Sequence, residues 1–157
     1  MEAMIMGLLD PSAWTPRLLS VLRIVTAFIF MLHGTAKILH LPPLPRYEQL
    51  QWLSLGGVAG LLELVGGGLL LLGLFTRPVA FILSGEMAAA YFIAHAPRSV
   101  LPLLNNGDAA VLYCFVFLFL AAAGAGPWSI DAWRARSADG SECAAGGRAR
   151  RDSVSAD

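Results

Sequence analysis

The sequence predicts an all-α integral membrane protein, a four-helix bundle with its N- and C-termini in the cytoplasm. Hydrophobic residues make up 57% of the 157-residue chain and charged residues only 14%, against about 25% in ordinary soluble domains. Mean hydropathy is +0.65. The apolar residues fall into four blocks of about 17–23 residues, the length that a helix needs to cross about 30 Å of hydrocarbon.

The four predicted spans follow one another closely along the chain. They cover about residues 17–39, 55–75, 79–96 and 109–125. Prolines lie at the edges of the blocks, where the missing backbone N–H ends a helix without breaking it. A soluble bundle would carry a polar stripe along each helix, whereas these blocks are apolar around most of their circumference.

The segments outside the spans set the expected orientation. Residues 1–16 form an N-terminal segment, residues 17–133 the membrane domain, and residues 134–157 a polar tail predicted to be disordered. Five arginines in this tail place it in the cytoplasm by the positive-inside rule, and four spans return the N-terminus to the same side. These arginines are Arg134, Arg136, Arg148, Arg150 and Arg151.

Polar side chains inside or next to the spans are the candidate pocket or ion-pair residues. A charged group in a span is costly, so it usually faces the bundle interior and finds a partner. The candidates are Arg23, His33, Lys37, Glu63, Glu86, His95, Asn106 and Asp108. At about 1.5 Å per residue, all except Arg23 fall in the middle or the outer half of the bilayer. We therefore expect a polar half-pocket that faces outward.

Helical spacing narrows the expected pairings. His33 and Lys37 lie one turn apart on nearly the same face of the first span. Lys37 is expected to pair with Glu63 or Asp108. Arg23 is expected to pair with Glu86.

Glycines in the second span predict a tight helix–helix seam, because small residues let helices approach closely in lipid. The candidate packing residues are Gly56, Gly60, Gly66 and Gly67. Glu63 shares a stripe with three of them, so we expect its side chain to point into the bundle.

Four motifs in order resemble the DoxX family. They are an arginine followed by HGxxK (Arg23, His33, Gly34, Lys37), then ExxGGxxLxxG from Glu63 to Gly73 followed by Thr76-Arg77, then NNGDAAVLY, and finally GAGPWSID. The resemblance covers about residues 17–133. Asn106-Gly107-Asp108 departs from it, because the family commonly has a double glycine followed by glutamate.

The resemblance implies a multi-pass, four-helix protein of the bacterial inner membrane, in a family of which some members are associated with redox systems. A related family supplies the DoxD small subunit of a thiosulfate:quinone oxidoreductase. The expected function is therefore an accessory or quinone-interacting subunit of a membrane redox system, with quinone as the candidate cofactor. The expected partners are the lipid bilayer, a redox partner protein and a second copy of the chain.

Several alternatives stay open at the level of sequence. Glu63 and Glu86 either relay protons to a quinone or form structural ion pairs, and Lys37 either holds a head group or snorkels to the interface. The chain could instead be a non-redox carrier of small solutes, or an assembly or structural partner. Whether it is an enzyme stays open as well.

Other functions find little support in the sequence. No third ligand is suitably spaced to join His33 and His95 in a metal site. Cys114 and Cys143 are expected at different depths, which argues against dithiol chemistry. A formal net charge of zero argues against nucleic-acid binding.

Overall fold

The computed structural model describes residues 11–138, and this part of the chain is all-α. Three of its helices are long and apolar enough to cross a membrane. They are α2 (Pro11–Ile38), α3 (Leu55–Leu72), and α4 (Thr76–Ala90) with its π-helical continuation η2 (Tyr91–His95). A fourth apolar helix, α6 (Asp108–Ala123), has 16 residues and is shorter than these three.

Shorter elements complete the chain. The 3₁₀-helix η1 (Pro45–Tyr47) lies between α2 and α3, and α5 (Pro102–Asn105) lies between η2 and α6. Residues 130–138 form a further helix after α6.

The helix bounds differ from the expected spans mainly at the ends. The first helix begins at Pro11 instead of residue 17, and it contains Pro16, whose missing N–H removes one hydrogen bond from the helix. Residues 134–138 continue a helix where the sequence predicted the start of an irregular tail. The rest of that tail, with Cys143 and three of its five arginines, lies outside the described residues, as do residues 1–10.

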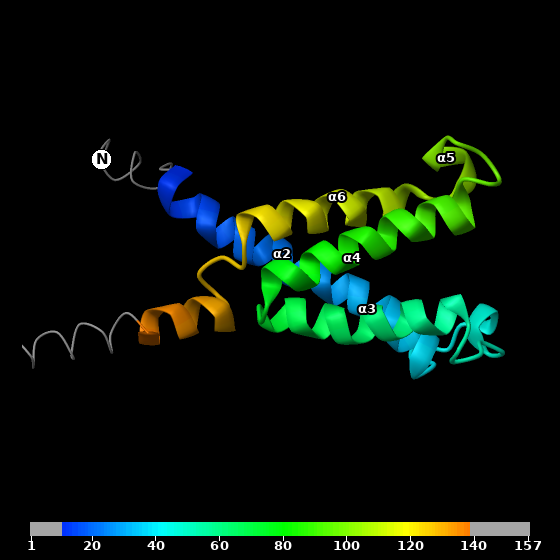
Figure 1. Cartoon of the computed structure of the whole chain (residues 1–157), viewed down its shortest axis with the longest axis horizontal. Helices are drawn as coiled ribbons and strands as arrows, with labels where there is room; N and C mark the ends of the chain where they lie inside the picture. Colours follow the sequence, from blue (N-terminus) through cyan, green and yellow to red (C-terminus); the bar gives the residue numbers. More distant parts are fainter. Residues whose placement is uncertain (1–10, 139–157) are drawn as a thin grey trace, which may run out of the picture.

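The helices are arranged as two pairs that meet at one end (Figure 1). The α2 helix packs on α3 and α4 packs on α6, and α3 and α4 diverge from the turn that connects them. The start of α2, the α3–α4 turn and residues 130–138 all lie toward the same end of the bundle. The short elements η1 and α5 lie at the opposite end.

Glycines bring α2 and α3 into backbone contact. A Cβ added to Gly34 would lie 2.8 Å from the Leu64 Cα, and one added to Gly67 would lie 2.9 Å from the Met31 Cβ. A Cβ added to Gly60 would likewise lie 2.8 Å from the Lys37 Cβ. Small residues therefore set the close approach of these two helices, as the sequence predicted.

The other predicted packing glycines have different neighbours. Gly66 faces Leu83 of α4, so it serves the α3–α4 contact. Gly56 faces Leu50 in the α2–α3 connection and contacts no neighbouring helix at that point. Of the two glycines in the GxxxG pattern, Gly56 therefore contacts a loop and Gly60 contacts a neighbouring helix.

The two helix pairs are tied together at the end where α3 turns into α4. Arg23 is fully buried there and donates hydrogen bonds to four backbone carbonyls, those of Leu70, Leu71, Ala125 and Trp128. Its charge lies against the C-terminus of α3, where the helix dipole favours a cation. Arg77 donates in the same way to the Ala121 and Ala122 carbonyls at the end of α6.

Asp131 completes this tied end. Its carboxylate accepts the backbone N–H groups of Phe75 and Thr76, at 3.0 and 2.9 Å, at the start of α4. Burial raises the pKa of Asp131, but these hydrogen bonds and the nearby Arg134 charge outweigh burial and hold the pKa below its ordinary value. Segments far apart in the sequence are thereby fixed to one another.

Candidate functional site

A pocket of about 740 Å³ lies between the two helix pairs, and its lining includes Arg46 and Tyr47 of η1. Its volume falls within the roughly 300–1,000 Å³ of ligand pockets in general. Most of its lining is apolar, from α3, α4 and η2. Six of the predicted site residues line it: His33, Lys37, Glu63, Glu86, His95 and Asn106.

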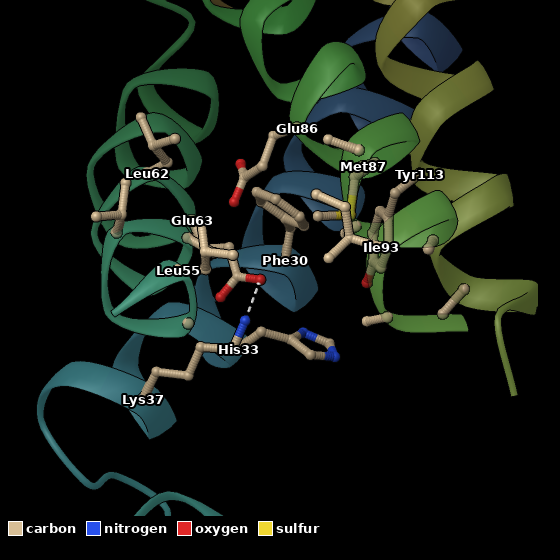
Figure 2. Close-up of a pocket in the computed structure, with 18 of the residues that line it drawn as sticks. Phe30, His33, Lys37, Leu55, Leu62, Glu63, Glu86, Met87, Ile93 and Tyr113 are labelled. Atoms are coloured by element: carbon tan, nitrogen blue, oxygen red, sulfur yellow. Dashed lines mark hydrogen bonds and ion pairs between the residues drawn. The ribbon is translucent and has the colours of Figure 1, made fainter. Parts of the chain in front are cut away.

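Lys37 and Glu63 form an ion pair on the wall of the pocket (Figure 2). The Lys37 Nζ lies 2.6 Å from the Glu63 Oε1, and the two side chains are only 15% and 4% exposed. The pair depends on Gly60, because any side chain there would collide with Lys37. The second carboxylate oxygen of Glu63, Oε2, is buried and accepts no hydrogen bond within residues 11–138.

Glu86 lies on α4, across the pocket from α3 (Figure 2). Both of its carboxylate oxygens are buried, and neither has a hydrogen-bond partner in the described part of the chain. A buried polar group without a partner costs free energy, and in hydrocarbon no bulk water compensates for it. Glu86 is therefore the least satisfied polar side chain of the site.

Both histidines use one ring nitrogen in a hydrogen bond to a backbone carbonyl. The Nδ1 atom of His33 lies 3.1 Å from the Ile29 carbonyl, and that of His95 lies 3.1 Å from the Asn105 carbonyl. A carbonyl only accepts, so Nδ1 carries the proton in each case. In the neutral imidazole, Nε2 is then left as a hydrogen-bond acceptor.

Aromatic side chains form one wall that sequence reasoning missed. Phe30 and Tyr113 line the pocket with ring centroids 5.1 Å apart, and Tyr113 lies edge-on to His33. Tyr113 belongs to the NNGDAAVLY motif, and a tyrosine in an otherwise apolar helix was the available signal.

The connection between η2 and α6 is ordered by a buried asparagine. Asn105 donates to the Ser99 carbonyl at 2.6 Å and accepts from the Gly107 N–H at 2.7 Å. This arrangement places its neighbour Asn106 at the pocket. Asn105 itself does not line the pocket, and its role is to shape the loop.

Two predicted site residues lie outside the pocket. The expected Arg23–Glu86 pair does not form, because Arg23 is used at the tied end and Glu86 faces the pocket. Asp108 is exposed in the first turn of α6, where the helix dipole favours an acid, and Lys37 pairs with Glu63 instead. Within residues 11–138, no three metal-ligating side chains come together.

Comparison with known proteins identifies the family. The sequence model of the DoxX family matches residues 18–96. An uncharacterized protein of Haemophilus influenzae is 42% identical over 132 residues, which cover 75% of this chain and 91% of that protein. The chain belongs to the DoxX family of membrane proteins. No solved structure shows significant similarity to it.

Proposed function

We propose that this protein binds the head group of a quinone or quinol in its pocket, as an accessory subunit of a membrane redox system. In this role the chain positions the head group and exchanges hydrogen bonds with it, and a redox partner protein carries the electrons. The proposal includes a four-span bundle in a bacterial inner membrane, with both termini in the cytoplasm and the pocket toward the outer side.

The observation that carries the proposal is the buried, unpartnered carboxyl group of Glu86 in a largely apolar pocket. A ligand hydroxyl would satisfy this group, and a water-filled site would not need such an apolar lining. Other lining residues offer further acceptors, the Glu63 Oε2 and the Nε2 atom of His33, and the Lys37 ammonium is a donor. Both forms of the ligand are therefore matched, the quinol through its hydroxyls and the quinone through its carbonyls.

The first test is composition of the purified protein. The chain is extracted in mild detergent, and its bound small molecules and copurifying proteins are determined by mass spectrometry. Near-stoichiometric quinone would support the proposal. A preparation free of quinone that also binds no added ubiquinol would contradict it, and would favour a solute carrier or an assembly partner.

Substitution of Glu86 separates a binding role from a structural one. We expect Glu86→Leu to weaken binding of ubiquinol about tenfold or more, because it removes hydrogen bonds to the ligand. The same change should leave the thermal midpoint of the ligand-free protein unchanged or raise it, because a buried unsatisfied group disappears. Both quantities are measured in the same detergent.

The matched control is Glu48→Leu, at an exposed glutamate after η1 and outside the pocket. This variant should bind ubiquinol as the wild type does. A clear loss of stability in Glu86→Leu with unchanged binding would show that Glu86 has a structural partner, and would overturn its assigned role.

A further inference from the structure

Resting on the proposed function, we propose that the ligand enters from the bilayer, between α3 and α4, and leaves its long apolar tail in that opening. The pocket would then accept a tailed, lipid-soluble quinol in preference to a water-soluble head group.

Three sides of the pocket are closed by packing. The α2–α3 seam is in backbone contact at Gly34, so nothing passes there. On the opposite side, Ser84 of α4 donates to the Cys114 carbonyl of α6 at 2.8 Å. Behind the pocket, Phe30 is fully buried and lies 4.8 Å from Phe117, centroid to centroid.

The α3–α4 side is different, because two stripes of pocket-lining residues there are exposed. The stripes are Leu55, Val58 and Leu62 on α3, and Ile82 and Ala89 on α4 with Ile93 on its continuation η2. Their helices diverge from the Gly73–Phe75 turn (Figure 1), and the stripes flank the carboxyl groups of Glu63 and Glu86 (Figure 2). An apolar opening that leads directly to polar groups suits an amphiphile whose tail stays in lipid.

The centre of the α4 stripe is occupied by a glycine. Gly85 lines the pocket, and a Cβ added there would meet no atom within 4 Å. This glycine is therefore not needed for close helix packing, unlike those on α3. Its absent side chain leaves space beside Glu86, at the point where a ligand must pass.

Gly85→Leu is the decisive variant, because it adds a side chain in the opening at a position where an added Cβ meets no atom within 4 Å. Gly68→Leu is its matched control: Gly68 is also helical and has no atom within 4 Å of an added Cβ, but it does not line the pocket. Leucine is a better helix former than glycine, so neither change should prevent folding. Ala89→Leu, on the same exposed stripe, is a second blocking variant.

Binding is measured anaerobically in lipid nanodiscs with two probes. Radiolabelled ubiquinol-0, which has no tail, reports the head-group site directly, and ubiquinol-10 competes with it. In Gly85→Leu we expect competition by ubiquinol-10 to weaken about tenfold or more, because the leucine clashes with the tail. Binding of ubiquinol-0 should change far less, and Gly68→Leu should match the wild type with both probes.

The possible failures are distinguishable. If the wild type binds neither probe, the proposed function itself is wrong. If the wild type binds both, and Gly85→Leu and Ala89→Leu leave competition by ubiquinol-10 unchanged or weaken both probes equally, the proposed function stands and the entry route is wrong.

Discussion

Arg23 and Glu86 show how differently two buried charges of opposite sign are accommodated in one bundle. Arg23 has several donors in a fixed planar arrangement, and four backbone carbonyls use them. Glu86 has only acceptors to offer when ionised, and nothing in the described chain donates to it. The first group is structurally satisfied, whereas the second is available to a ligand.

Sequence reasoning reached part of this picture. The cost of a charge in a span suggested that Lys37 pairs with Glu63 or Asp108, and the structure places the Lys37 Nζ 2.6 Å from the Glu63 Oε1. The sequence-based prediction paired Arg23 with Glu86 from their charges alone. Every residue has a backbone carbonyl, so a sequence does not show which carbonyls accept hydrogen bonds from Arg23. Identifying which charge lacks a partner needs the positions of all the neighbours.

The role of Arg23 is testable by unfolding. We expect Arg23→Met to lower the free energy of unfolding by about 3 kcal/mol, since it leaves several buried carbonyls without donors. Arg23→Lys should keep little of the free energy of unfolding that Arg23→Met loses, because one ammonium cannot reach carbonyls arranged around a planar guanidinium. Unfolding is followed by circular dichroism in mixed detergent and SDS.

Arg17→Met serves as the control, because Arg17 is exposed on the same helix. It should change the free energy of unfolding by less than about 0.5 kcal/mol, as surface substitutions usually do. Full rescue of Arg23 by lysine would mean that charge, and not the hydrogen-bond geometry, matters at this position.

The helices themselves were largely predictable, because hydropathy alone reveals long apolar segments. The positions of the helix ends were less predictable. The π-helical turn Tyr91–His95 depends on local hydrogen bonds, such as that from the Ala96 N–H to the Tyr91 carbonyl. Likewise, the start of α4 is stabilised by Asp131, which comes 55 residues after Thr76.

Asp131 makes the stability of α4 dependent on pH. Its pKa in the folded protein is below that of the unfolded chain, so its stabilising contribution is present above the unfolded value and is lost as the pH falls through the folded one. We expect Asp131→Asn to remove about 1 kcal/mol of stability at neutral pH. The difference from wild type should shrink as the pH falls below the ordinary aspartate value of 3.8.

Thermal unfolding in detergent, followed from neutral pH into this acid range, measures the effect. Asp108→Asn is the control, because Asp108 is an exposed acid at another helix start. A constant difference between wild type and Asp131→Asn at every pH would contradict the assigned role of the carboxylate.

For the molecule as a whole, composition was enough to predict an all-α membrane protein, and the motifs were enough to place it in its family. The pocket was predictable only as a tendency of polar residues to gather in one half of the bundle. Its shape depends on the divergence of α3 and α4 and on aromatic residues such as Tyr113, which sequence spacing does not locate.

Labelling of single cysteines tests the proposed orientation. With Cys114 and Cys143 replaced by alanine, we expect Gln49→Cys, in the α2–α3 connection, to react with a membrane-impermeant maleimide in intact cells. Arg136→Cys should react only after the cells are opened. The opposite pattern would invert the topology. Labelling of both sites in intact cells would contradict the three proposed spans between them, because an odd number of spans puts two sites on opposite sides of the membrane.

The two helix pairs are joined at one end of the bundle and separate toward the other, so one pair can rotate relative to the other about the joined end. The hydrogen bonds of Arg23, Arg77 and Asp131 fix the joined end. A small rotation of one helix pair therefore displaces the far end more than any point near the joined end. The connections that carry η1 and α5 lie at the far end. Ligands of different girth would therefore be accommodated by a change in angle, with the largest movement in those two connections and almost none beside Arg23.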